Sequence, residues 1–532
     1  MSLAASGPCD ETIARSAAET PCGRSAARWT LAATILGSGM AFLDGSVVNV
    51  ALPVLQKSLN ASAQQAQWVF EAYLLFLSSL VLVGGSLGDR IGRRRVFLAG
   101  VVLFTASSAA CGLAPSSNWL IAARAAQGIG AALLIPSSLA ILGAVFPAGE
   151  RGRAIGIWSS LTAIAGVIGP LLGGWLVEVS SWRAVFFVNL PIAAGVVIIT
   201  WTKVPESRNA GAKSLDWAGT VLATLGLAGL VFGLIEAPTA GWRAPSVWIS
   251  LCAGAVALFA FAIVELRSAH PMIPGELCRN RSFVGANLLT FFLYAALSEA
   301  LFFLPFDLIQ AQGYSPAGAG ATMLPLVLIL FALSRTTGAI ADRIGPRILL
   351  TGGPAVAAIG FFLLSRAGVG ARFTTTFLPA LIVLGLGMVM TVAPLTTTVM
   401  NSVDREQEGT ASGVNNAVSR VAGLLAIAAL GIVASRTFDT TLTRRLSEPG
   451  FSDAARQIPR SERDKLGAAQ PPSGLSAAEA ARVREAIAFS LTAAFQVLTR
   501  ICALLALLGS ISAALLIPPP SPAKSRAVRH RD

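Results

Sequence analysis

Charged residues are scarce in this chain. Asp, Glu, Lys and Arg make up 13% of its 532 residues, whereas 54% are hydrophobic. A soluble domain usually carries about 25% charged residues. This deficit excludes an ordinary soluble protein and predicts that most of the chain lies within a lipid bilayer.

Residues that support much of enzyme chemistry are also few. The two histidines, His270 and His530, fall in loops or tails, which argues against a His-based metal or haem site. The six cysteines are scattered without metal or redox spacing. The chain has no Gly-x-x-x-x-Gly-Lys-Ser/Thr phosphate loop, so direct coupling to ATP is not expected. We therefore predict a protein that is not an enzyme and that uses no cofactor and no metal.

Apolar residues, in contrast, form long blocks. Each block has about 20 residues, enough for a helix to cross a hydrocarbon core of roughly 30 Å. This pattern predicts an all-α polytopic membrane protein with about fourteen transmembrane helices. Their approximate limits are 29–52, 67–88, 96–114, 118–142, 154–178, 183–202, 216–236, 246–266, 284–311, 317–340, 348–366, 373–400, 410–434 and 488–516.

A short charged turn between apolar blocks occurs twice, as GSLGDRIGRRR at 85–95 and as GAIADRIGPR at 338–347. Gly, Asp, Arg and Gly occupy the same offsets in both copies, namely Gly85, Asp89, Arg90 and Gly92, and Gly338, Asp342, Arg343 and Gly345. A turn repeated in this way indicates a transporter built from two related helix bundles. The copies are about 250 residues apart, whereas six helices with loops need about 200. We therefore predict six helices, two inserted helices and six more.

This plan divides the chain into five segments. They are a disordered cytoplasmic tail at 1–28, a six-helix bundle at 29–203, two inserted helices with their loops at 204–282, a second six-helix bundle at 283–517 and a basic cytoplasmic tail at 518–532. The second bundle includes a long loop near 435–486, which is rich in Arg, Ser, Ala and Pro, and we expect it to be partly disordered.

The positive charges indicate the orientation in the membrane. The net charge is +13, and the Arg and Lys residues of short loops gather on one side of the predicted topology. Because short cytoplasmic loops are enriched in such residues, we predict a multi-pass plasma (inner) membrane protein with both termini in the cytoplasm. The 435–486 loop then lies outside, since long loops cross the membrane largely regardless of charge. The basic composition therefore does not indicate binding to nucleic acid.

Four motifs give the chain a family resemblance. Residues 43–53 (LDGSVVNVALP), 85–95, 124–130 (RAAQGIG) and 166–174 (GVIGPLLGG) occur in order, each in its expected span or loop. With them the chain resembles the major facilitator superfamily, in its fourteen-helix drug:H⁺ antiporter branch. The last motif usually has a glycine where this chain has Ala165. The resemblance implies the major facilitator fold.

Two charged residues lie inside predicted spans of the first bundle. Asp44 and Arg124 are each costly to bury, so each should face a cavity or a partner of opposite charge. The resemblance implies that Asp44 is the proton-coupling acid and that Arg124 assists proton transfer. Gln127 lies one helical turn after Arg124 and is a candidate for the substrate cavity. The alternative is that Asp44 and Arg124 only hold the helices together.

Glycines dominate the predicted fifth span. Small residues allow two helices to approach closely, and proline removes a hydrogen bond within the helix. The resemblance adds that this helix shapes a gate that favours exchange of substrate for protons. The residues concerned are Gly166, Gly169, Pro170, Gly173 and Gly174.

The repeated turn is interpreted as a conformational latch rather than a binding site. The resemblance implies that its charge pairs break and form as the two bundles move; Asp404, Glu406 and Glu408 are possible partners. The alternative is a positive anchor at the membrane surface. The latch residues are Gly85, Asp89, Arg90, Gly92, Arg93, Asp342 and Arg343.

Three further acids, Glu71, Glu299 and Asp307, lie in or near spans. An acid within the membrane is by default a functional candidate. We predict Glu71 and Glu299 as additional proton-coupling groups and all three as residues of the substrate cavity. Asp307 is nearer the outer end of its span, and solvation there is the alternative.

Together these features predict a proton-coupled multidrug efflux transporter that exports hydrophobic or cationic small molecules by alternating access. We expect it to work as a monomer. One alternative is a narrow exporter of one metabolite or antibiotic, and another is a non-transporting receptor or scaffold. The substrate itself is not encoded in a short motif.

Overall fold

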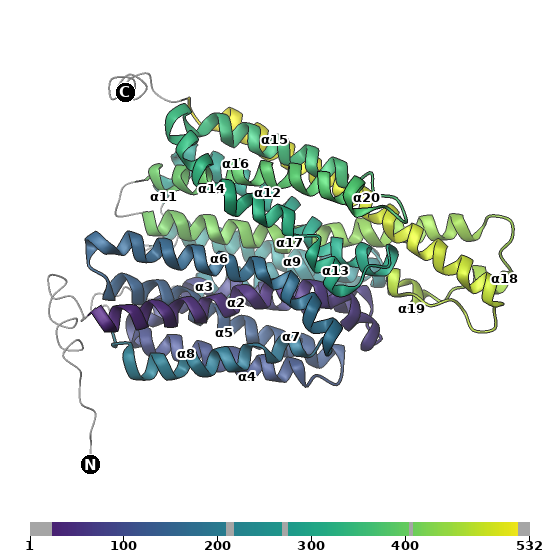
Figure 1. Ribbon diagram of the computed structural model, residues 1–532, viewed down its shortest axis with the longest axis horizontal. Helices are drawn as coiled ribbons and strands as arrows, with labels where there is room; N and C mark the ends of the chain where they lie inside the picture. Colours follow the sequence, from purple (N-terminus) through teal and green to yellow (C-terminus); the bar gives the residue numbers. More distant parts are fainter. Residues whose placement is uncertain (1–23, 209–216, 269–274, 404–407, 520–532) are drawn as a thin grey trace, which may run out of the picture. The chain divides into compact units, whose positions relative to one another are not determined.

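The computed structural model describes residues 24–208, 217–268, 275–403 and 408–519 (Figure 1). The chain divides into two compact units. Unit 1 comprises Met1–Leu59 and Trp68–Leu227, and unit 2 comprises Asn60–Gln67 and Ala228–Asp532. Most of the two predicted tails lies outside the described residues. Helix α2 begins at Arg24, however, so the predicted limit of the first tail at residue 28 is wrong by one turn.

Unit 1 is a bundle of long helices. Helix α4 packs along α5, and α2 packs against α6, α8 and α5. The core includes the aromatic residues Tyr73, Phe97 and Phe104. The helices are α2 (Arg24–Ser58), α3 (Ala63–Ile91) from Trp68 onward, α4 (Arg93–Gly112), α5 (Ser117–Val145), α6 (Ala148–Val179), α7 (Ala184–Phe187), α8 (Asn189–Lys203) and the start of α9 (Trp217–Ala240).

Glycine determines how closely α4 and α5 pack. A Cβ atom on Gly100 would lie 2.7 Å from the backbone nitrogen of Leu134, and one on Gly130 would lie 2.5 Å from that of Phe104. Real Cβ atoms essentially never approach a backbone atom so closely. The two helices therefore meet along their backbones, as small residues permit in membrane bundles.

Unit 2 contains the first residues of α3, the end of α9 and all later elements. Helices α15 and α16 pack together, and α12 packs against α17 and α20. The elements are α10 (Pro245–Arg267), α11 (Gly275–Arg279), α12 (Arg281–Phe306), the π-helix η1 (Asp307–Ala311), α13 (Pro316–Ala321), α14 (Leu324–Ile344), α15 (Pro346–Leu364), the π-helix η2 (Phe373–Phe377), α16 (Leu378–Asn401), α17 (Glu408–Leu446), α18 (Asp453–Arg456), α19 (Arg460–Arg463), η4 (Leu466–Ala468) and α20 (Ala477–Leu516).

The number of membrane spans agrees with the sequence. Among the described residues, 13 helices are long and apolar enough to cross a membrane, and the bent helix α3 raises the number to 14. The bend of 51° separates Ala63–Val81 from Val83–Ile91. No strand occurs in the described part of the chain. The predicted all-α polytopic fold with fourteen spans is confirmed.

The predicted external loop at 435–486 is shorter than expected. Helix α17 has 39 residues and α20 has 40. At about 1.5 Å per residue each is roughly 60 Å long, about twice the thickness of the hydrocarbon core. Both helices therefore extend beyond the membrane, and only 447–476 connects them (Figure 1).

Both ends of the predicted loop at 435–486 are helical and contain buried apolar residues. The extension of α17 buries Phe438, Leu442 and Leu446, and that of α20 buries Val483 and Ile487. These apolar residues recur at helical spacing, so the two helices continue to pack against each other outside the lipid. This helical spacing was not recognised in the sequence because the segment is rich in Arg and Pro.

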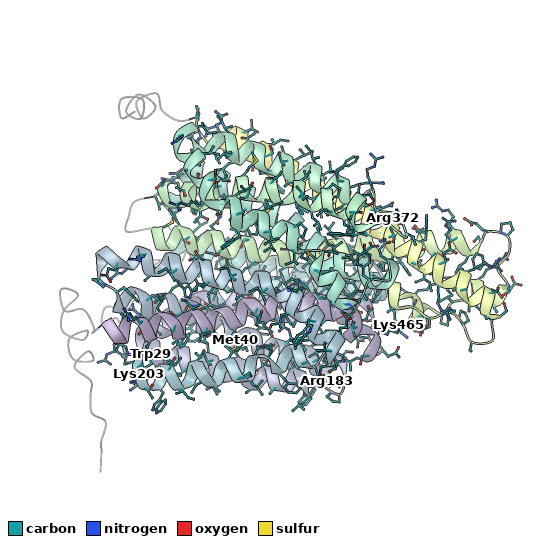
Figure 2. All side chains as sticks on the ribbon, viewed as in Figure 1. Trp29, Met40, Arg183, Lys203, Arg372 and Lys465 are labelled. Carbon is teal, nitrogen blue, oxygen red and sulfur yellow. The ribbon has the colours of Figure 1, made fainter. Side chains whose placement is uncertain are left out.

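Hydrogen bonds hold the same segment together. Lys465 is labelled in Figure 2. Its Nζ donates to Glu462 Oε1 over 2.5 Å and to Asn60 Oδ1 over 2.7 Å. Arg456 Nε donates to the carbonyl oxygen of Leu446 over 3.2 Å. We refer to residues 435–486 as the outer extension, where outer means beyond the membrane-spanning part of α17 and α20 and does not specify the side of the membrane.

Candidate functional site

The centre of unit 1 contains a buried ion pair. Arg124 of α5 donates from Nη1 to Oδ2 of Asp44 on α2 over 2.5 Å, and both side chains are 0% exposed. Gln127 Nε2 donates to Oδ1 of Asp44 over 2.8 Å. Asn189 Nδ2 of α8 donates to the same oxygen over 3.1 Å. Donors from α5 and α8 thus converge on one carboxylate of α2.

The arginine has additional contacts. Its Nε donates to the carbonyl oxygen of Val69 over 3.1 Å, and its guanidinium lies 4.2 Å from the ring centroid of Tyr73. Nη1 also lies 2.8 Å from Oε1 of Gln127, within hydrogen-bonding distance. Arg124 would therefore keep an oxygen acceptor and an aromatic face if it lost the carboxylate. Such alternatives matter because an unpaired buried charge is strongly destabilising.

Asn189 and Ser108 complete the cluster but were missed in the sequence. Asn189 Nδ2 donates to Ser108 Oγ over 3.0 Å, and Ser108 Oγ donates to the carbonyl oxygen of Phe186 over 2.8 Å. An amide within the apolar span 183–202 was a detectable signal for Asn189. A serine in a membrane helix is too common to have indicated Ser108.

The glycine motif of α6 packs on the segment of α2 that bears Asp44. A Cβ on Gly169 would collide with the side chain of Ser46, and one on Gly173 would lie 2.7 Å from the carbonyl oxygen of Val47. A Cβ on Gly166 would make only an ordinary contact, 3.8 Å from Phe42. The close approach of α6 to α2 therefore depends on two of the glycines.

The other two residues of the motif differ in role. Pro170 lies inside α6 between the two contacting glycines and removes one hydrogen bond from the helix. Gly174 is buried next to Gly173. Among the five predicted residues, Gly169 and Gly173 carry the close contact with α2.

The first charged turn lies between α3 and α4. Gly92 separates the two helices with φ 125°, a conformation that side chains other than glycine rarely adopt. Arg93 forms an ion pair with Asp89 over 2.8 Å. Arg90 is exposed, and Gly85 would accept a Cβ at 3.5 Å from Pro136, an ordinary contact.

Glu206 is the partner of this turn that the sequence analysis missed. Its Oε1 accepts from the backbone N–H of Arg94 over 3.0 Å, and its Oε2 accepts from that of Arg95 over 3.3 Å. The carboxylate therefore caps the N-terminus of α4, where an acid is favoured. The suggested partners Asp404 and Glu406 lie outside the described residues, and so does the side chain of Glu408.

The second charged turn shares the backbone geometry of the first. Gly345 lies between α14 and α15 with φ 87°. Arg347 Nη2 donates to the carbonyl oxygen of Ala514 on α20 over 2.6 Å. Arg343 is exposed, and the side chain of Asp342 lies outside the described residues. The positive φ explains why glycine occupies the same offset in both copies, at Gly92 and Gly345.

Replacement of Glu206 by alanine should destabilise unit 1. The variant leaves N–H groups at the start of α4 without their acceptor, and loss of a helix cap costs about 0.5–2 kcal/mol. We expect the unfolding temperature in detergent, followed by tryptophan fluorescence, to fall by several degrees, since 1 kcal/mol corresponds to about 2–4 °C in large domains. Glu150→Ala is the control, because Glu150 lies exposed in the first turn of α6 without a cap bond. Equal unfolding temperatures for both variants would contradict this role of Glu206.

The remaining acids are buried in different surroundings. Glu71 of α3 is 0% exposed and lies two residues after Val69, whose carbonyl oxygen binds Arg124. Glu299 of α12 is 1% exposed, and its Oε2 has no hydrogen-bond partner among the described residues. It belongs to unit 2, as does Asp307.

Asp307 lies at the start of η1 and is hydrogen-bonded through both carboxylate oxygens. Its Oδ1 accepts from Thr492 Oγ1 over 2.8 Å, and its Oδ2 accepts from Gln312 Nε2 over 3.2 Å. The side chain is 0% exposed, so the alternative of a solvated acid is wrong. The position of Asp307 near a helix end had suggested contact with water, but Thr492 of α20 binds the carboxylate instead.

No group of three or more His, Cys, Asp or Glu side chains that could hold a metal ion occurs in the part of the chain that the structure describes. The helical spans, the repeated turn and the buried charge pair define a multi-span membrane protein with features typical of transporters. Residues 34–427 match the sequence profile of the Major Facilitator Superfamily. The chain belongs to this superfamily.

Curated relatives agree with this assignment. The chain is 37% identical over 418 residues to the multidrug resistance protein Stp of Mycobacterium tuberculosis, covering 78% of each chain. It is 34% identical over 418 residues to the tetracenomycin C resistance and export protein of Streptomyces glaucescens, covering 77% of this chain and 76% of the relative. The puromycin resistance protein pur8 of Streptomyces alboniger is 35% identical over 412 residues, 76% of this chain and 82% of the relative.

A solved structure shares the fold. The inward-facing, unoccupied form of a bacterial homologue of the human lysosomal transporter Spinster aligns with a TM-score of 0.66 at 17% identity. The alignment covers 94% of this chain and 100% of the other. At this identity the similarity concerns the fold alone.

Proposed function

We propose that this chain is a proton-coupled multidrug efflux transporter of the plasma membrane, with both termini in the cytoplasm. The observation that carries the proposal is the buried pair of Asp44 and Arg124 in unit 1. A carboxylate in the middle of a membrane helix is costly and marks an ion pathway or proton relay in transporters. The export and drug-resistance functions of the relatives support the same direction of transport.

The pair suggests how a proton is used. Protonation of Asp44 removes the negative charge that Arg124 binds, and the arginine retains the carbonyl oxygen of Val69 and the ring of Tyr73. Helices α2, α5 and α8 are then held together differently in the two protonation states. Proton entry supplies roughly 2.3 kcal/mol per charge per 100 mV of membrane potential, which can drive uphill export.

Other acids provide further candidate sites for protons. Glu299 is favoured by its burial and by the unpartnered Oε2 atom, whereas Glu71 is favoured by its proximity along α3 to the backbone contact of Arg124. Asp44, Glu71, Gln127 and Glu299 remain our candidates for the substrate cavity. Asp307 is the weakest, because Thr492 and Gln312 already satisfy its carboxylate.

The remaining motif residues fit roles in the conformational cycle. The charged turn with Asp89, Arg93 and its cap Glu206 would act as the latch, and α6 would couple movement to Asp44 through its contact with α2. We propose a monomer that alternates between inward and outward states around one cavity.

Efflux of ethidium from energised cells tests the proposal. We expect cells expressing the protein to extrude the dye, and a protonophore to stop the extrusion. Cells with an empty vector give the background. Efflux that continues after the proton gradient collapses would contradict proton coupling.

A narrow exporter of one antibiotic is the second candidate. The names of relatives such as the cephamycin export protein of Amycolatopsis lactamdurans, which is 35% identical over 392 residues, favour it. A panel of structurally unrelated dyes and antibiotics separates the two functions. Export of a single compound from the panel would support the narrow exporter.

A further inference from the structure

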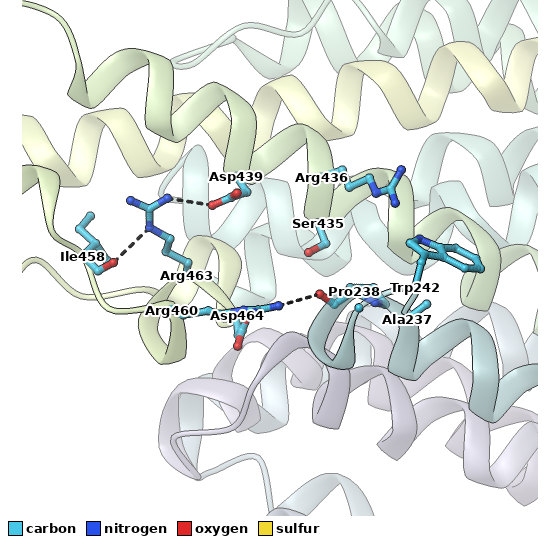
Figure 3. Close-up of a pocket in the computed structure, with 11 residues that line it drawn as sticks. Ala237, Pro238, Trp242, Ser435, Arg436, Asp439, Ile458, Arg460, Arg463 and Asp464 are labelled. Carbon is cyan, nitrogen blue, oxygen red and sulfur yellow. Dashed lines mark hydrogen bonds and ion pairs between the residues drawn. The ribbon is translucent and has the colours of Figure 1, made fainter. Parts of the chain in front are cut away.

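A pocket of about 460 Å³ lies in unit 2, between the outer extension and residues 237–242 (Figure 3). Its walls come from the last turn of α9, the outer half of α17 and the segment around α19. The pocket is separate from the buried pair of unit 1, and the inference drawn from it does not depend on the proposed function. Its size is sufficient for a small ligand or a lipid headgroup.

Three arginines and two aspartates line this pocket. Arg463 Nη1 donates to Oδ1 of Asp439 over 2.9 Å, so this pair is neutral. Arg460 Nη2 donates to the carbonyl oxygens of Thr239 and Pro238 over 2.8 and 3.3 Å and so caps the C-terminus of α9. Both bonds hold the walls in place.

The second aspartate is balanced by a neighbouring arginine. Burial raises the pKa of the Asp464 carboxyl from its usual value, and the charge of Arg460 opposes this rise. Asp464 and Arg460 therefore also offset each other. One positive charge remains, on Arg436, whose side chain is exposed and has no partner among the described residues.

An aromatic side chain accompanies the unpaired arginine. Figure 3 shows Trp242 and Arg436 toward the end of the pocket away from Ile458. Trp248 Nε1 donates to the carbonyl oxygen of Trp242 over 2.8 Å, and the two rings are 6.3 Å apart. Tryptophans in such pairs are typical of the interface between hydrocarbon and headgroups.

The adjoining helix indicates that lipid reaches the pocket. Helix α10 follows Trp242, and only 11% of the residues in its most apolar stretch are buried. Ile249, Val256 and Phe259 are all more than half exposed, as expected for side chains that face lipid tails. A tryptophan at the end of a lipid-facing helix is typical of the headgroup level, and Trp242 lines the pocket together with Arg436.

We propose that this pocket binds the phosphate of an anionic phospholipid headgroup, with Arg436 as the phosphate ligand and Trp242 as the wall at the membrane surface. A guanidinium can bind phosphate through two parallel hydrogen bonds because its N–H donors lie in one fixed plane. The ammonium group of lysine is a point charge and does not make this paired contact. Bound lipid would join the inserted helices α9 and α10 to the outer extension.

Native mass spectrometry of the full-length protein in detergent tests the site. The purified chain is titrated with phosphatidylglycerol, phosphatidylcholine or inorganic phosphate. We expect phosphatidylglycerol to bind in preference to phosphatidylcholine, and Arg436→Gln to weaken its binding about fivefold or more, as loss of a charge-assisted contact predicts. Arg366→Gln is the matched control, because Arg366 is exposed in the turn after α15 and does not line the pocket.

The outcomes distinguish the sources of phosphate. Weaker lipid binding in Arg436→Gln alone supports the proposal, and partial recovery in Arg436→Lys adds to it. If Arg436→Gln and Arg366→Gln weaken the binding of phosphatidylglycerol equally, the lipid is held by nonspecific charge attraction, and the proposal is overturned. Binding of inorganic phosphate that depends on Arg436, without a preference for phosphatidylglycerol, would assign the pocket to a soluble anion instead. Size-exclusion chromatography of each variant verifies its folding.

Discussion

Asp44→Asn is expected to abolish proton-driven efflux. Asparagine has the shape of aspartate and keeps an oxygen that can accept from Gln127 and Asn189, but it cannot take up the proton or pair with Arg124. We expect the rate of ethidium transport in proteoliposomes with an imposed proton gradient to fall to that of protein-free vesicles.

Stability has to be separated from coupling in this experiment. Removal of one partner from a buried ion pair costs about 3–5 kcal/mol, so the unfolding temperature of Asp44→Asn should be measured beside transport. Ser38→Ala is the matched control, because Ser38 is buried on the same helix and bonds Ser138 over 2.8 Å without touching Asp44. Full proton-driven transport by folded Asp44→Asn would refute its role and make Glu299 the next candidate.

The second large effect is expected for the glycines of α6. Gly169→Ala and Gly173→Ala place a methyl group against Ser46 and the backbone of Val47, so α6 must move away from α2. Overpacking of this kind costs about 1–3 kcal/mol, and it acts next to Asp44. We expect both variants to lose most of their transport and to unfold several degrees earlier than the wild type.

Gly166→Ala provides the comparison within the same motif. Its new methyl group would lie 3.8 Å from Phe42, an ordinary contact, so stability and transport should stay close to those of the wild type. Equal loss of transport in all three variants, without a change in unfolding temperature, would indicate that the motif acts through flexibility of α6 rather than through packing.

Local patterns explain why much of the fold could be predicted. Blocks of about 20 apolar residues predict membrane helices because the bilayer imposes one length on every span. The turn around Gly92 and that around Gly345 were recognised from adjacent residues, and their positive φ values explain the repeated glycine. The length of α17 was missed because the periodic residues Phe438, Leu442 and Leu446 stand among charged ones.

Contacts between distant residues account for the functional residues that were missed. Asn189 reaches Asp44 across 145 positions of the chain, and Glu206 reaches Arg94 across 112. Nothing in the neighbouring sequence of either residue indicates that pairing, because it depends on how the helices pack. The hydrogen bond from Thr492 to Asp307 also spans 185 positions of the chain, so the sequence around Asp307 did not indicate it.

The sequence by itself determined the class of protein, the membrane helices and the identity of the charged residues within them, since hydrophobic length and charge burial are properties of short segments. Only the tertiary structure decided which donors surround Asp44, which glycines touch α2 and which arginine shares a pocket with Trp242 without a partner among the described residues. These features arise where helices from distant parts of the chain meet, and the free energy of each depends on the partner that packing brings to it.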